Sequence, residues 1–185
     1  TNSQNKVQSN YAYATRNGNQ TGIVDSISFI KSTADGNTVL LPQLSYAYDA
    51  NGNITNVYEN GVQKVKYYYD GLNRLVREDN GYIDKTVVYG YDKCGDILSK
   101  TEYALTSSET LGTPVDTINY AYTNSNFKNG VTLYDGTDTI EYDENGNPVS
   151  YRGYSMVWTK GRQLAALSDT ETTMSFKYDC NGIRT

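Results

Sequence analysis

The sequence has no histidine and little proline or cysteine: its 185 residues include no His, 3 Pro and 2 Cys. Because histidine is the commonest general base and metal ligand in proteins, its absence excludes a His-based catalytic triad or His zinc site within this chain. No run of apolar residues approaches the length of about 18 that a membrane-spanning helix needs. Basic residues are outnumbered, with 16 Lys and Arg against 21 Asp and Glu, and no basic block exceeds two residues. This charge balance argues against nucleic acid as a partner.

The two cysteines, Cys94 and Cys180, fit no CxxC metal or redox motif. We expect unpaired thiols in turns. A disulfide between them stays open as an alternative, because the sequence alone does not tell how close their Cα atoms come. We predict no cofactor, no metal and no enzymatic activity for the chain.

Aromatic residues are abundant, with 19 Tyr, 3 Phe and 1 Trp, whereas disordered chains are poor in aromatics. The tyrosines recur in a motif of the form Tyr-x-Tyr-Asp-x-x-Gly-x-Ile/Leu, which is clearest at residues 46–54 and 89–97. Related copies put Phe or Ile in the first slot, Trp in the second, or Asn73 in place of the glycine. The second aromatics fall at residues 13, 48, 69, 91, 122, 142, 158 and 178. Four of the seven successive spacings are 20 to 22 residues, so the chain is a tandem repeat.

Each repeat of about 21 residues is typical of two strands and two turns. The Asp carboxylate of the motif can accept bonds from backbone amides two or three residues on, and the glycine takes the left-handed conformation. Asn-Gly pairs at residues 60–61, 80–81 and 129–130 predict type I′ hairpin turns. Period-two alternation predicts strands, for example over 62–69 and 82–91, and no stretch of 10 or more residues favours a helix. The segment 107–114, rich in Ser, Thr, Gly and Pro, predicts a loop, and a short helical turn is tolerable only within 103–111.

The sequence therefore predicts an all-β fold: an antiparallel repeat sheet of successive hairpins, curled rather than flat because sheets twist. The motif residues that we expect to shape the repeats are Tyr46, Tyr48, Asp49, Gly52, Tyr67, Tyr69, Asp70, Tyr89, Tyr91, Asp92, Gly95, Tyr142, Asp143, Gly146, Trp158, Gly161, Tyr178, Asp179 and Gly182.

On these motifs, the chain resembles the YD repeat of Rhs proteins, which also occurs in bacterial wall-associated proteins and in teneurins. The resemblance covers residues 44–185 well and residues 1–43 weakly. It implies a sheet that spirals into a hollow β-shell, which in bacterial members encloses a C-terminal toxin domain, and a secreted or cell-surface protein. The family's aspartate-bearing cap segment after the repeats has no counterpart here, so no catalytic residue is carried over.

We accordingly expect one continuous domain, with weakly matching repeats in 1–43 and the YD-repeat sheet in 44–185, cut from a longer protein at both ends. The expected partners are the neighbouring repeats and the C-terminal toxin or cargo domain of the parent. Exposed edge strands would also allow self-association.

Three other interpretations compete with a purely structural one. The segments 49–53 and 143–147 resemble the start of a calcium loop, but they lack the Glu at the twelfth position and the flanking helices of an EF-hand. Carboxylate pairs such as Asp135 with Asp138 could serve a glycosidase, but no second constellation supports them. The tyrosine ladder can be sheet core or shell lining, or it can present rings to cell-wall or surface carbohydrate. Burial of the rings separates the last two interpretations.

Overall fold

The computed structural model describes residues 6–33 and 36–185, and these residues form strands and turns without a helix. Among them, therefore, no helix is long and apolar enough to span a membrane. The chain divides into two compact units, one of residues 1–89 with 102–115 and one of residues 90–101 with 116–185. The all-β class predicted from the sequence is confirmed.

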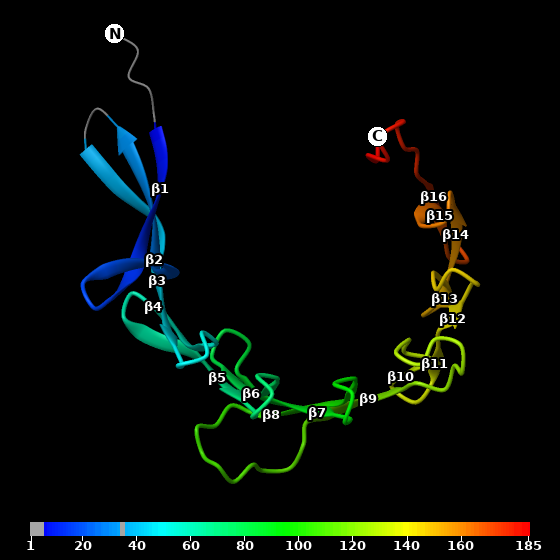
Figure 1. Ribbon diagram of the computed structural model, residues 1–185, viewed down its shortest axis with the longest axis horizontal. Helices are drawn as coiled ribbons and strands as arrows, with labels where there is room; N and C mark the ends of the chain where they lie inside the picture. Colours follow the sequence, from blue (N-terminus) through cyan, green and yellow to red (C-terminus); the bar gives the residue numbers. More distant parts are fainter. Residues whose placement is uncertain (1–5, 34–35) are drawn as a thin grey trace. The chain divides into compact units, whose positions relative to one another are not determined.

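The first unit holds a meander in which each strand pairs antiparallel with the next (Figure 1). Its strands are β1 (Lys6–Arg16), β2 (Asn19–Thr33), β3 (Gly36–Tyr48), β4 (Ile54–Glu59), β5 (Val62–Tyr69) and β6 (Leu75–Asn80). Two further strands contribute residues to both units: β7 (Lys85–Tyr91) and β8 (Ile97–Ala104).

The second unit continues with shorter strands, again antiparallel between neighbours. These are β9 (Asp116–Ala121), β10 (Leu133–Tyr134), β11 (Asp138–Thr139), β12 (Glu141–Tyr142), β13 (Pro148–Tyr151), β14 (Tyr154–Thr159), β15 (Gln163–Ser168) and β16 (Thr173–Ser175). In both sheets the strand order is the chain order, β1 to β11 in one and β12 to β16 in the other. Within each sheet, every connection therefore joins neighbouring strands, which is why a local sequence repeat can build the fold.

Two-residue turns with positive φ at both positions close several of the hairpins. Asn60 and Gly61 have φ of 49° and 79°, the values of the predicted type I′ turn. The same pair of positive φ values occurs at Asn17–Gly18, Asp135–Gly136, Arg152–Gly153 and Lys160–Gly161. Arg and Lys are not typical of this conformation, so the turns at Arg152 and Lys160 have no turn signal at their first position.

The prediction of a type I′ turn at Asn80–Gly81 is wrong. Asn80 pairs with Lys85 across a longer turn, and the positive φ falls at Asp84. The Gly81 amide instead donates to the carbonyl of Lys64 at 2.7 Å. This tether fixes Gly81 against β5, and the strand predicted to begin at residue 82 begins at Lys85.

The prediction at Asn129–Gly130 is also wrong, because neither residue has positive φ. Here the Asn124 side chain accepts hydrogen bonds from the amides of Asn126 and Phe127, and the Gly130 amide donates to the Phe127 carbonyl. The segment is therefore a side-chain-stabilised loop between β9 and β10. The segment 107–114 is a loop as predicted, and no helical turn forms within 103–111.

The described residues contain little apolar core. Val87 is fully buried and Val65 is 3% exposed, and most strand residues are half-buried. Val65, Tyr67 and Tyr69 alternate with Lys64, Lys66 and Tyr68 along β5, so these two sets lie on opposite faces. A sheet with so little fully buried apolar surface depends on cross-strand pairs and on side-chain hydrogen bonds.

Candidate functional site: the junctions between repeats

The motif turn is a hydrogen-bonded loop around one aspartate. At Asp49, the carboxylate Oδ1 accepts the backbone amides of Asn51 and Asn53, both at 2.9 Å. The Gly52 amide donates to the Asp49 carbonyl at 3.2 Å, and Gly52 has a φ of 88°. A side chain at Gly52 would be strained by this backbone conformation although it would meet no atom within 4 Å. The glycine is thus required for its conformation, not for space.

The same turn forms at four other motif aspartates: Asp70, Asp92, Asp143 and Asp179. The left-handed residue three positions on is Gly95, Gly146 or Gly182 in three of them. In the fourth, Asn73 takes it with a φ of 60°, as its side chain allows.

These hydrogen bonds also set the ionisation of the aspartates. The Asn53 side-chain amide lowers the pKa of Asp49, and the Asn147 side-chain amide lowers the pKa of Asp143. The backbone amide and side chain of Arg74 lower the pKa of Asp70, whose Oδ2 lies 2.7 Å from Arg74 Nε. We call Asp49, Asp70 and Asp143 the turn aspartates. Hydrogen bonds to the charged form favour that form, so each acts as a charged acceptor at neutral pH.

The second aromatic of several repeats donates a hydrogen bond to a backbone carbonyl earlier in the chain. Tyr69 donates its hydroxyl to the carbonyl of Ile54 at 2.8 Å, and Tyr122 donates to the carbonyl of Ile97 at 2.9 Å. Burial raises the pKa of both phenols, so both stay protonated donors at neutral pH.

The acceptor has a fixed place in the repeat. Ile54 and Ile97 each lie six residues after the second aromatic of the preceding motif, Tyr48 and Tyr91. The rule also holds for Trp158 and for Tyr178: the indole Nε1 of Trp158 donates to the carbonyl of Pro148 at 2.7 Å, and Tyr178 donates to Leu164 at 3.1 Å. We call Tyr69, Tyr122, Trp158 and Tyr178 the junction aromatics.

Trp158 explains how the repeat tolerates a substitution. Indole and phenol share an aromatic body and one donor, and both usually find a partner when buried. The hydrogen bond at this junction is therefore kept although the residue type changes. Tyr48 and Tyr142 also donate to backbone carbonyls, those of Val24 and Val131, but after intervals altered by insertions.

Side chains also link neighbouring turns. The Asn73 side-chain oxygen accepts from the amides of Asn51 and Asn53, each at 2.9 Å. Asn147, which is 5% exposed, donates to the Gly161 carbonyl at 2.6 Å as well as to Asp143. Successive turns are thereby held in a row along the edge of the repeats that they join.

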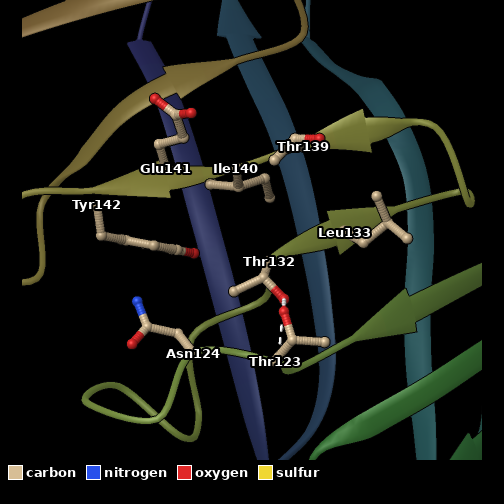
Figure 2. A pocket seen from close by; sticks show the side chains of 8 residues that line it. All are labelled: Thr123, Asn124, Thr132, Leu133, Thr139, Ile140, Glu141 and Tyr142. Carbon is tan, nitrogen blue, oxygen red and sulfur yellow. Dashed lines mark hydrogen bonds between the residues drawn. The ribbon is translucent and has the colours of Figure 1, made fainter.

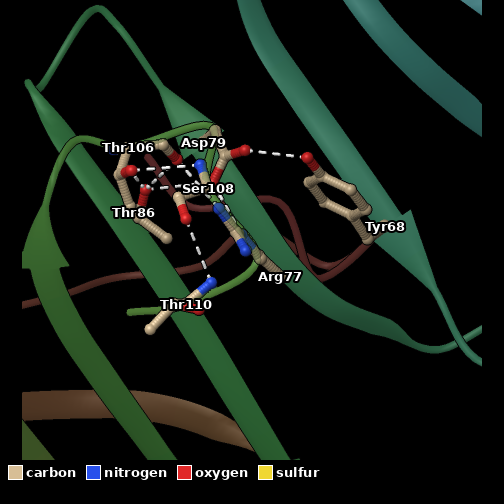
Figure 3. Close-up of polar contacts among 7 residues, drawn as sticks. All are labelled: Tyr68, Arg77, Asp79, Thr86, Thr106, Ser108 and Thr110. Carbon is tan, nitrogen blue, oxygen red and sulfur yellow. Dashed lines mark hydrogen bonds and ion pairs between the residues drawn. The ribbon is translucent and has the colours of Figure 1, made fainter. Parts of the chain in front are cut away.

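A polar cluster holds the loop 105–115 on the face of the first sheet that carries Lys64, Lys66 and Tyr68 (Figure 3). The Asp79 carboxylate lies between Arg77 Nε at 2.8 Å, the Tyr68 hydroxyl at 2.9 Å and the Thr86 hydroxyl at 3.0 Å. Arg77 donates to the carbonyl of Thr106 at 2.8 Å. The Thr86 hydroxyl lies 3.0 Å from this carbonyl as well as from Asp79, donates its single proton to one of the two, and accepts the Thr106 amide. Thr86 is fully buried and Asp79 is 8% exposed, so a satisfied polar network fixes one end of the loop.

A cleft of about 480 Å³ lies beside Tyr142 in the second unit (Figure 2). Hydroxyl and amide groups line it, including Thr123 and Thr132, whose Oγ1 atoms are 2.8 Å apart. Glu141 borders it with its carboxylate turned away from Tyr142 and the two threonines, and no histidine, cysteine or second acid lines it. This lining provides hydrogen-bonding groups but no nucleophile–base pair.

The remaining chemistry of the described residues is sparse. No group of three or more Cys, Asp or Glu side chains among them is placed to hold a metal ion. Cys94 and Cys180 are free thiols, both exposed in motif turns. The calcium-loop resemblance at 49–53 and 143–147 resolves into self-capped turns, in which the aspartate is occupied by its own backbone amides.

Comparison with known proteins bears directly on this repeat. Residues 48–82 match the family model described as RHS Repeat. The chain carries an RHS repeat. In structure it is similar to the crystal structure titled TcdB2-TccC3-Cdc42, with a TM-score of 0.67, 18% identity and 96% of this chain covered. It is also similar to the TcdB2-TccC3 crystal structure, with a TM-score of 0.63, 16% identity and the same coverage.

These similarities show the fold and not the activity. The chain spans about a tenth of the length of each of these two solved chains, 10% in both comparisons. No curated protein matches it. The RHS resemblance inferred from the tyrosine motif is confirmed.

The RHS-matched segment contains two motif turns and the junction between them, Tyr69 to Ile54. The first tyrosines of these motifs, Tyr46, Tyr67 and Tyr89, are half-buried, and the Tyr89 hydroxyl donates to Glu78 at 3.0 Å. The acceptor carbonyls and the cluster around Asp79 were not predicted from the sequence. A backbone acceptor has no residue-type signal, but the constant six-residue offset could have indicated it.

Proposed function

We propose that this chain is a wall segment of an RHS-type β-shell in a larger secreted or cell-surface protein, and that the shell encloses a C-terminal toxin or cargo domain. The observation that carries the proposal is the repeated junction: four aromatics donate to the carbonyl at the same offset in the preceding repeat. Such nearest-neighbour joints let a wall extend by adding identical units. The role is structural and needs no catalytic residue.

The edge strand β1 indicates which partners the segment needs. Strand β1 pairs with β2 alone among the described strands, so one of its edges offers free backbone groups. Unpaired strand edges readily pair with another strand. We propose that preceding repeats of the parent cover this edge, and that an isolated segment would associate with a second copy instead.

Limited proteolysis of the full-length parent tests enclosure. The C-terminal domain should resist protease in the native parent. It should become cleavable when two junction aromatics are replaced together, as Tyr69→Ala and Tyr122→Ala. Tyr154→Phe serves as the matched control, because its ring is 42% exposed and its hydroxyl has no hydrogen-bond partner in the described chain. Equal cleavage of the C-terminal domain in the native parent and the junction variant would contradict enclosure.

Polysaccharide binding is the second candidate, and one observation favours it. Tyr11 and Tyr13 lie two residues apart on β1 and are 51% and 40% exposed, so their rings are open to a ligand. Exposed aromatic rings provide stacking surfaces. If these tyrosines bind wall polysaccharide, adding it should reduce the quenching of their fluorescence by acrylamide. If they only pack against neighbouring strands, the quenching should stay unchanged.

A further inference from the structure

A cleft of about 470 Å³ opens on the face of the sheet that carries the loop 105–115. Lys64, Lys66 and Asp79 line it from the sheet, and Leu105, Thr106 and Ser107 line it from the loop. Lys64 and Lys66 alternate with Val65, so both side chains lie on the cleft face of β5.

The charge in this cleft is unbalanced. The carboxylate of Asp79 is occupied by Arg77, Tyr68 and Thr86. Within the described residues, neither Lys64 nor Lys66 lies within ion-pair distance of a carboxylate. Lys66 instead contacts the Tyr68 ring, with its Nζ 4.6 Å from the ring centroid. Two ammonium groups thus share one half-buried cleft in a chain whose net charge is −5. Like charges on one face repel unless an anion lies between them.

The wall opposite the lysines is held in place before any ligand binds. Thr106 is fixed by Thr86 and Arg77, as Figure 3 shows, and the far end of the loop is closed by the Val115 amide, which donates to the Glu102 carbonyl at 2.7 Å. On the sheet side, the Gly81 amide is tied to the Lys64 carbonyl. Fixed walls lower the entropy cost of binding.

We propose that this cleft binds an oxyanion, a carboxylate or phosphate group, through the ammonium groups of Lys64 and Lys66. The hydroxyl of Ser107 supplies a neutral donor on the opposite wall. The proposal does not depend on the shell function, since it rests on the charge and the fixed walls alone.

The test is an NMR titration of the ¹⁵N-labelled chain with inorganic phosphate and, separately, with a hexaglutamate peptide. We expect saturable shifts at residues 64–66 and 105–107 with at least one probe. The variant Lys64→Gln/Lys66→Gln should raise the dissociation constant at least tenfold, whereas Lys64→Arg/Lys66→Arg should keep binding within about threefold. Lys93→Gln/Lys160→Gln is the matched control, because it removes the same charge from exposed turns.

Saturation by phosphate alone identifies a phosphate site, and saturation by the peptide alone identifies a carboxylate site. The proposal is overturned if neither probe saturates, or if the control weakens binding as much as the Lys64/Lys66 variant does. Should the glutamine variant not fold, the native titration decides, since shifts spread evenly over exposed lysines would show non-specific screening only.

Discussion

Replacing Tyr69 with phenylalanine removes one hydroxyl and leaves the ring in place. That hydroxyl donates to the Ile54 carbonyl at 2.8 Å from a half-buried position. A hydrogen bond of this kind contributes about 1 kcal/mol net, and the unpaired carbonyl of a half-buried strand end can still reach water. We therefore expect a loss of about 1 kcal/mol in the free energy of local opening.

Hydrogen–deuterium exchange measures that loss where it occurs. A decrease of about 1 kcal/mol corresponds to about fivefold faster exchange for amides that exchange by local opening. The effect should concentrate in residues 48–82, which contain the two repeats that this bond joins. Tyr154→Phe, the exposed control, should leave exchange unchanged. Equal effects of the two substitutions, or no effect of Tyr69→Phe, would refute the claim that junction aromatics hold the repeats together.

Three further outcomes are expected. The folded-state pKa of each turn aspartate is lowered from 3.8. The stability that each carboxylate contributes is therefore present above that value and is lost as pH falls through the lower folded pKa. Thermal melting should show a falling Tm below about pH 4, and a flat profile there would contradict the turn geometry. Gly146→Ala places a Cβ 2.9 Å from Phe127 at a φ of 76° and should cost more Tm than Gly52→Ala, which meets strain alone; equal losses would show that Phe127 moves freely. Thr86→Val removes the single hydroxyl proton that Asp79 and the Thr106 carbonyl share, and it removes the acceptor of the Thr106 amide. It should cost about 1–3 kcal/mol in urea unfolding and speed protease cleavage within 106–114. Unchanged cleavage would show that the cluster does not hold the loop.

The sequence predicted those features that are encoded within a few residues. The motif turn needs an aspartate to accept nearby amides and a residue that tolerates positive φ, and both are visible in the sequence, even where Asn73 replaces glycine. The strand 62–69 follows from its alternation of apolar and basic residues, and its bounds match the structure.

Features set by contacts between distant residues were not predicted. Asn80–Gly81 has the sequence of a type I′ turn, but the bond from Gly81 to the Lys64 carbonyl determines its conformation. Thr86 has the polar character of a solvent-facing residue, yet it is fully buried because the loop 105–115 lies over it. The junction acceptors are backbone carbonyls between 10 and 25 residues from their donors, and the sequence carries no mark of them.

A cryo-electron microscopy map of the full-length parent tests the central claim most directly. The account predicts that residues 6–185 form part of a continuous wall, with each junction aromatic against the carbonyl of the preceding repeat, around a closed cavity that contains further polypeptide density. An open sheet without an enclosed volume, or repeats separated by flexible linkers, would contradict it.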